Sequence, residues 1–185
     1  MLFRTRYWAL NLQNIFMDEM PTLKTSVFNW IFGFLLPSTI NVTLIDSGSS
    51  LMTLLHEDIV NYAHRAYKKG LKCGIDGNKL SCEKQGKMIT TDFPIIKVSF
   101  GKTIFRIRNE TLIDSCNYDG YKTSCQLKIQ ENFHMPMRIF GMPFMQSIYS
   151  IFDRDNLKIG LAQIPDRFFI NEDKFMKDIT DIEEA

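Results

Sequence analysis

The sequence lacks an excess of charge of either sign, because 22 lysine and arginine residues face 21 aspartate and glutamate residues, a formal net charge of +1. A strongly basic surface is therefore not expected, which argues against a nucleic-acid partner or an acidic membrane surface. Glycine and proline are also scarce, at 10 and 6 of 185 residues, which excludes collagen-like and low-complexity chains. The length suits one globular domain with a core of its own.

Long uninterrupted apolar runs are absent as well. The most apolar stretch, residues 27–45, is broken by asparagine, glycine, proline, serine and threonine. A membrane-spanning helix needs about 20 mostly apolar residues. We therefore expect no membrane span in this chain.

Cysteine and histidine are few, at 4 and 3 residues, and neither a Cys-x-x-Cys pair nor the Cys/His spacing of a zinc site occurs. We therefore expect no metal and no cofactor. The cysteines are Cys73, Cys82, Cys116 and Cys125. Two disulfides are plausible, either local (Cys73–Cys82, Cys116–Cys125) or long-range (Cys73–Cys116, Cys82–Cys125), and four reduced cysteines are the alternative. Loop-closure entropy, about 3 kcal/mol for the short loops and about 4 kcal/mol for the long ones, does not decide the pairing.

Two triplets, Asn41-Val42-Thr43 and Asn109-Glu110-Thr111, match the acceptor motif for N-glycosylation. They favour the secretory pathway, as a pair of disulfides would. No signal peptide is visible, because the basic residues Arg4 and Arg6 are not followed by an apolar run of the required length.

The pattern of apolar residues predicts a strand-rich fold with short helices. The many isoleucines and the 15 phenylalanines suit pleated, half-buried strands. Helical spacing of apolar residues predicts a helix over 55–69. Residues 94–100 and 103–107 form a predicted hairpin, since Gly101 supplies the positive φ of a two-residue turn. Further strands are expected at residues 6–12, 42–45, 123–129, 137–140, 148–152 and 158–162.

The most informative segment is Asp46-Ser47-Gly48-Ser49-Ser50, which follows the apolar strand at 42–45. The strand delivers a carboxylate onto a glycine-containing turn that carries three hydroxyl groups. Small residues there let backbone N–H groups and hydroxyls approach and hydrogen-bond the carboxylate. Taken alone, Asp-Ser-Gly is a common turn sequence.

A second segment must be considered together with the Asp46 segment. Ile139-Phe140-Gly141 is followed by residues 149–162, which contain Phe-Asp-Arg and end in Ile-Gly-Leu-Ala. From Tyr7 to Ile164 the chain resembles the C-terminal half of a pepsin-like aspartic protease. That half carries Asp-(Thr/Ser)-Gly-(Thr/Ser)-Ser, then two hydrophobic residues and Gly, then a Phe-Asp-Arg ending, in this order. The resemblance implies an all-β lobe with a few short helices, one of the two lobes of that fold.

The resemblance also assigns roles to residues. Asp46 would be one of two catalytic aspartates, Gly48 would let the substrate backbone come close, and Ser49 would hydrogen-bond around the carboxylate. The residues implied in substrate binding are Gly48, Ser49 and Ser50, and those implied in supporting the active-site loop are Ser47, Ile139, Phe140 and Gly141. By the same resemblance Cys82–Cys125 is the usual bridge of this half, which leaves Cys73–Cys116 as a second bridge. It further implies a secretory, lysosome-like or extracellular location.

The catalytic chemistry of this family needs two carboxylates. At a separation of about 3 Å they share one proton, so that one acts as base on a water and the other supports the oxyanion of a peptide substrate. The sequence contains one Asp-(Ser/Thr)-Gly. We therefore expect the chain to be inactive alone and to need a missing N-terminal lobe. The alternatives are a homodimer of the retroviral type, in which a second copy supplies the second aspartate, and a non-catalytic lobe that binds peptides or dimerises.

The expected organisation has four parts. Residues 1–17 form the strand that enters the lobe, and residues 18–39 are an atypical segment, either a loop or a misjoined exon. Residues 40–165 form the lobe itself, and residues 166–185 form an acidic tail. The family usually has an aspartate after Gly141, where this chain has Met142.

Overall fold

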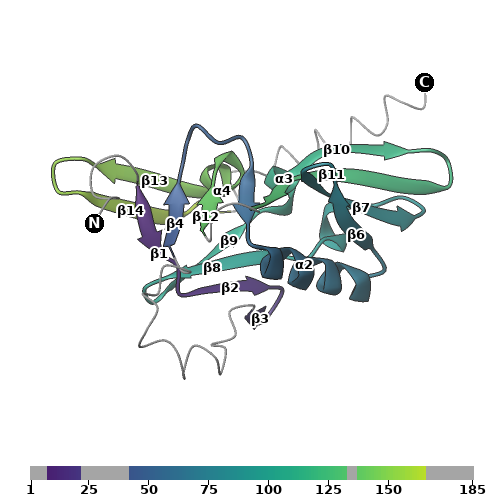
Figure 1. Cartoon of the computed structure of the whole chain (residues 1–185), viewed down its shortest axis with the longest axis horizontal. Coiled ribbons are helices and arrows are strands. Elements are labelled where there is room, and N and C mark those ends of the chain that lie inside the picture. The colour runs from purple at the N-terminus through teal and green to yellow at the C-terminus, as the bar shows by residue number, and fades with distance from the viewer. Residues whose placement is uncertain (1–7, 22–41, 133–136, 166–185) are drawn as a thin grey trace.

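The structure is a computed structural model that describes residues 8–21, 42–132 and 137–165 (Figure 1). Most of the atypical segment at 18–39, the acidic tail at 166–185, and Asn41 of the first glycosylation motif lie outside the described residues. The described part is mostly β-strand with short helices, so the predicted fold class is confirmed.

The largest sheet has short strands at one side and longer strands at the other. In the centre, β12 runs parallel to β4 on one side and antiparallel to β5 on the other. The strand β11 pairs with β5, β7 and β10. In the order of the sheet, the strands are β1 (Ala9–Asn11), β4 (Val42–Ile45), β12 (Arg138–Phe140), β5 (Met52–Leu54), β11 (Lys122–Glu131), β7 (Lys79–Gln85) and β6 (Lys72–Asp76), with β10 (Ile113–Tyr118) beside β11.

A second sheet and a separate hairpin complete the strands. The second sheet has the order β3 (Met20–Pro21), β2 (Asn14–Met17), β8 (Ile96–Phe100) and β9 (Thr103–Ile107). Gly101 joins β8 to β9 with φ of 60°, as the predicted hairpin requires. The hairpin of β13 (Ile148–Asp153) and β14 (Lys158–Gln163) lies at one end of the long axis, and β6, β7, β10 and β11 reach the other end (Figure 1).

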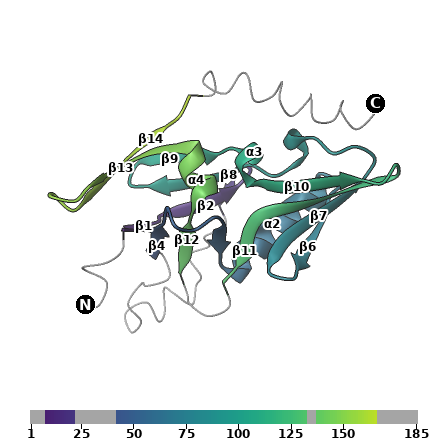
Figure 2. The ribbon, with the colours of Figure 1, turned by 90° about the horizontal axis from the view of Figure 1, so that it is seen from above.

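The helices pack against strands of both sheets. The predicted helix at 55–69 is α2 (His56–Lys68), which buries Ile59, Tyr62 and Ala66 at helical spacing. The shorter ones are α3 (Asn109–Leu112), α4 (Met142–Ser147) and the 3-10 turn η2 (Thr90–Asp92). Seen from above, α4 lies beside β9 and β12 (Figure 2).

Three phenylalanine rings of the core meet where β12 ends. The rings of Phe140 and Phe144 lie 5.1 Å apart, and Phe100 contacts them at 6.3 and 6.2 Å. Phe140 and Phe144 are fully buried. The strand β12 and the helix α4 that follows it are thus anchored to β8 by edge-on ring contacts.

The disulfide pairing that the resemblance implied, Cys82–Cys125 with Cys73–Cys116, is wrong. The structure pairs Cys73 with Cys82 and Cys116 with Cys125. All four lie in one row across β6, β7, β11 and β10, so Cys82 also faces Cys125. Along such a row, close and wide Cα spacings alternate. The bonded pairs have the close spacing, with Cα–Cα distances of 4.0 and 4.1 Å, and the alternation then gives Cys82 and Cys125 the wide one.

Candidate active site

The Asp46 loop, residues 46–51, is suspended between two strands. It leaves β4 after Ile45 and enters β5 at Met52, and β12 lies between these strands. The Asp46 N–H donates to the Phe140 carbonyl at 3.1 Å, and the Met142 N–H donates to the Ser49 carbonyl at 2.8 Å. The end of β12 therefore holds both halves of the loop.

Gly141 makes this approach possible. A Cβ atom there would lie 2.3 Å from the carbonyl oxygens of Ser49 and Leu51, and 2.9 Å from the Ser49 Cβ. Its φ is −90°, which other residues adopt, so space rather than backbone conformation requires glycine. The glycine predicted to support the loop is thus in contact with it, and Phe140 beside it is buried.

The Asp46 side chain is exposed and is oriented by its own loop. Its Oδ1 accepts the Gly48 N–H at 2.9 Å, and a Cβ at Gly48 would lie 3.2 Å from that oxygen. The resemblance implies that Ser49 hydrogen-bonds around the carboxylate. In the structure the Ser49 hydroxyl donates instead to the Leu51 carbonyl at 2.9 Å. The remaining residues of the predicted set, Ser47 and Ser50, are exposed, and Ile139 is half-buried.

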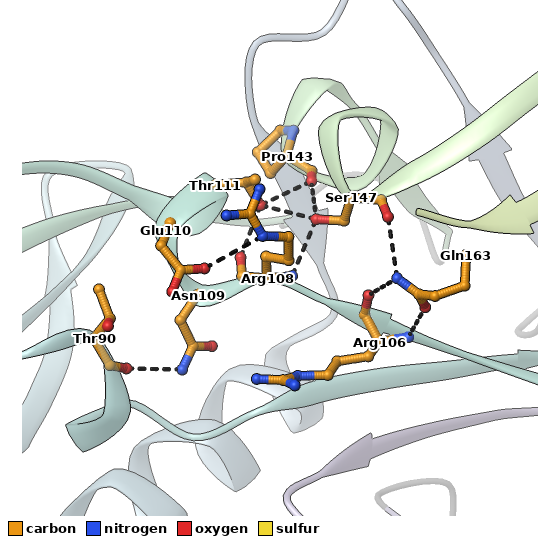
Figure 3. Close-up of polar contacts among 9 residues, drawn as sticks. All are labelled: Thr90, Arg106, Arg108, Asn109, Glu110, Thr111, Pro143, Ser147 and Gln163. Atoms are coloured by element: carbon orange, nitrogen blue, oxygen red, sulfur yellow. Dashed lines mark hydrogen bonds and ion pairs between the residues drawn. The ribbon is translucent and has the colours of Figure 1, made fainter. Parts of the chain in front are cut away.

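A buried polar network, which sequence reasoning missed, holds the helix α4 on the side away from the Asp46 loop (Figure 3). The Arg108 N–H donates to the Ser147 hydroxyl at 3.0 Å, and that hydroxyl donates to the Pro143 carbonyl at 3.0 Å. The Thr111 hydroxyl also lies 2.9 Å from the Pro143 carbonyl oxygen. The helix α4, which begins directly after Gly141, is thereby tied to α3 and the end of β9.

The Gln163 side chain extends this network to β14. Its Nε2 donates to the carbonyls of Arg106 and Ser147, each at 3.1 Å, and its Oε1 accepts the Arg106 N–H at 2.7 Å (Figure 3). The amide group thus pairs with both backbone groups of one residue of β9, as a neighbouring strand would.

The cysteines lie away from this loop, on the outer strands of the same sheet. Within the described ranges, no group of three or more histidine, cysteine, aspartate or glutamate side chains is placed to hold a metal ion. None of the described helices is long and apolar enough to cross a membrane.

The arrangement presents one carboxylate on a braced loop. Such a group can take a proton from water or give one to a substrate, but a single carboxyl cannot be base and acid at once. Chemistry that uses a base and an acid together would need a second titrating group opposite Asp46.

One comparison with known proteins gives a match over most of the chain. A family model described as eukaryotic aspartyl protease matches residues 2–164, which include the Asp46 loop, β12 and the hairpin of β13 and β14. No curated protein matches the chain.

Proposed function

The chain belongs to the eukaryotic aspartyl protease family, and we propose that it is one lobe of an aspartic endopeptidase in which Asp46 is a catalytic carboxylate. The observation that carries the proposal is the close contact of Gly141 with the Asp46 loop. A loop that is hydrogen-bonded from both sides by one strand end holds its carboxylate in a fixed place, which catalysis requires.

In the proposed reaction Asp46 and a second carboxylate share one proton. The ionised member takes a proton from water as the water oxygen attacks the carbonyl carbon of the peptide bond. The protonated member donates its proton to the carbonyl oxygen, which gives a tetrahedral diol. The first member then passes the proton that it took from water to the nitrogen, the carbon–nitrogen bond breaks, and one hydroxyl of the diol returns its proton to the second member. Gly48, Ser49 and Ser50 are proposed to line the place where the peptide lies, and Ser47 with residues 139–141 to support the loop.

The second carboxylate comes from elsewhere, since these 185 residues hold one Asp-(Ser/Thr)-Gly. We propose an N-terminal lobe as its source, with residues 40–165 as the C-terminal lobe and residues 1–17 as the strand that enters it. A second copy of this chain is the other source, because each residue near a two-fold axis meets its own twin. The exposure of Asp46 in the single chain is compatible with either source.

The test is cleavage of an unfolded protein at acidic pH by the full chain over a series of concentrations. We expect the single chain to be inactive at low concentration, because one carboxyl cannot fill both roles. Activity that rises as the square of the concentration identifies a second copy as the source. In any active assembly Asp46→Asn abolishes cleavage, whereas Asp155→Asn, at an exposed aspartate in the turn between β13 and β14, keeps it. Cleavage that survives Asp46→Asn contradicts the proposal.

A non-catalytic lobe that binds extended peptides is the second candidate, favoured by the presence of a single such carboxylate. It predicts peptide binding without cleavage at every concentration, and binding that Asp46→Asn leaves unchanged.

The two disulfides and the family fit a secretory or lysosomal route, which we propose as the location.

A further inference from the structure

A fully buried ion pair joins the start of β12 to the start of α2. The Arg138 Nε donates to Asp58 Oδ2 at 2.7 Å, and its Nη2 donates to Oδ1 at 3.0 Å. Both side chains have 0% exposure. The two parallel bonds match the guanidinium fork to the carboxylate, which fixes direction as well as distance.

Asp58 is itself fixed to the backbone. It lies in the first turn of α2, and its Oδ2 accepts the N–H of Leu55, the residue just before the helix, at 3.2 Å. That residue directly follows β5, the strand into which the Asp46 loop runs. The pair therefore links β12 to the segment that carries the far end of the loop.

The register of β12 decides whether the loop can be held. The strand has three residues, with Arg138 opposite Thr43 and Phe140 opposite Ile45 of β4. A slip by one residue would bring Phe140 or Met142 to the place of Gly141, where a Cβ atom lies 2.3 Å from two carbonyl oxygens. It would also turn Arg138 and Phe140 to the opposite face of the sheet.

A buried ion pair is a poor way to gain stability, since apolar residues of the same volume often serve equally well. Its use is to select one arrangement of the elements that it joins. We propose that Asp58 and Arg138 are positioning residues that lock the register of β12, so that Gly141 meets the Asp46 loop. This proposal deepens the proposed function, because it takes the Asp46 loop as the catalytic loop.

The test compares the full chain with the Asp58→Leu/Arg138→Met double variant, which replaces both buried charges with apolar side chains. Its control is Glu83→Leu/Lys122→Met, which removes an exposed ion pair between β7 and β11. Amide hydrogen exchange is followed by NMR at two residues. The Asp46 N–H donates to Phe140 of β12, and the Met142 N–H donates to Ser49 of the loop. Thermal unfolding is measured in parallel.

We expect the buried double variant to unfold near the wild-type temperature, while the Asp46 and Met142 amides exchange at least about tenfold faster and Gly48 shows more than one signal. The control keeps wild-type exchange at these amides. Wild-type exchange and a single Gly48 signal in the buried double variant would overturn the proposal.

If the double variant does not fold, the Arg138→Lys variant tests the register lock instead. Lysine keeps the positive charge but cannot form the two parallel hydrogen bonds of the guanidinium. Faster exchange at Asp46 and Met142 in that variant supports the register lock, and wild-type exchange refutes it. None of these readouts needs proteolysis. Cleavage that survives Asp46→Asn would remove the proposed function and leave the register result standing.

Discussion

At the scale of single residues, Gly141 tolerates the least change. We predict that Gly141→Ala destabilises the protein by about 3 kcal/mol, because its Cβ would overlap two carbonyl oxygens that the backbone holds in place. Urea unfolding measures the loss. Gly74→Ala in β6 is the control, since nothing lies within 4 Å of its Cβ position. Equal unfolding midpoints for the two variants would contradict the close contact.

The glycosylation motif at Asn109 is buried in the folded chain. The Asn109 Nδ2 donates to the carbonyls of Thr90 at 2.9 Å and Phe93 at 3.2 Å, and the Thr111 hydroxyl is buried as well. An N-linked glycan needs a surface asparagine. We predict that the folded chain, secreted from a eukaryotic cell, carries no glycan on Asn109, as peptide mass spectrometry would show. A glycan there on folded protein would contradict this placement.

The turn between β13 and β14 contains an aspartate with a lowered pKa. The backbone N–H of Asn156, 2.9 Å from Oδ1, and then its side-chain amide, 2.7 Å from Oδ2, hold the pKa of Asp153 below its usual value. The carboxylate therefore stabilises the turn at any pH above the ordinary aspartate pKa of about 3.9, and this contribution is lost as the pH falls through the lowered value.

We predict that Asn156→Ala raises the pKa of Asp153 part of the way, because the larger backbone contribution remains. A carbon-detected NMR titration of the Asp153 carboxyl measures the shift. Leu157→Ala, next to it in the turn, removes no hydrogen bond to Asp153 and serves as control. An unchanged pKa of Asp153 in Asn156→Ala would show that the side-chain amide does not bind it in solution.

At the scale of elements, the hairpin of β13 and β14 depends on Gln163. We predict that Gln163→Ala costs about 1 kcal/mol and speeds exchange of the Arg106 amide, which loses its acceptor. Gln85→Ala is the matched control, since that amide donates to the exposed Tyr121 hydroxyl. Unaltered exchange at Arg106 would mean that the Gln163 amide does not tie the hairpin to β9.

Long elements with a clear period could be predicted from sequence. Helical spacing located α2, and Gly101 located the turn between β8 and β9. The strand β5 was missed because all three of its residues are buried, so it shows no alternation. The hairpin of β6 and β7 was missed because β6 is polar at its ends and contains Gly74. β5 and β6 each carry a single β-branched residue, Thr53 and Ile75, which is too few to mark a strand.

The candidate site could be predicted in part. The Asp46 loop and residues 139–141 were identified through the family pattern, and the structure brings them into contact. The pair of Asp58 and Arg138 could not be predicted, because the two residues lie 80 positions apart and no local pattern connects them. The role of Gln163 was hidden for the same reason.

At the scale of the whole molecule, the all-β fold follows from strand composition and motif order, but the disulfide pairing does not. All four cysteines share one row across four strands, and loop entropy separates the pairings by about 1 kcal/mol. The disulfides form between the neighbouring cysteines whose Cα atoms have the close spacing. Which neighbours these are depends on the strand register, which the sequence does not reveal.

The central claim for the whole molecule is that the exposed Asp46 carboxylate meets a second carboxylate and shares one proton with it beside a bound peptide. The most direct measurement is a crystal structure of the active assembly with a peptide analogue that carries a hydroxyl group in place of the scissile carbonyl. We predict that this hydroxyl lies within hydrogen-bond distance of the Asp46 carboxylate and of one further carboxylate, with Gly141 still against the Asp46 loop. An analogue bound away from Asp46 would contradict the assignment of this residue to catalysis.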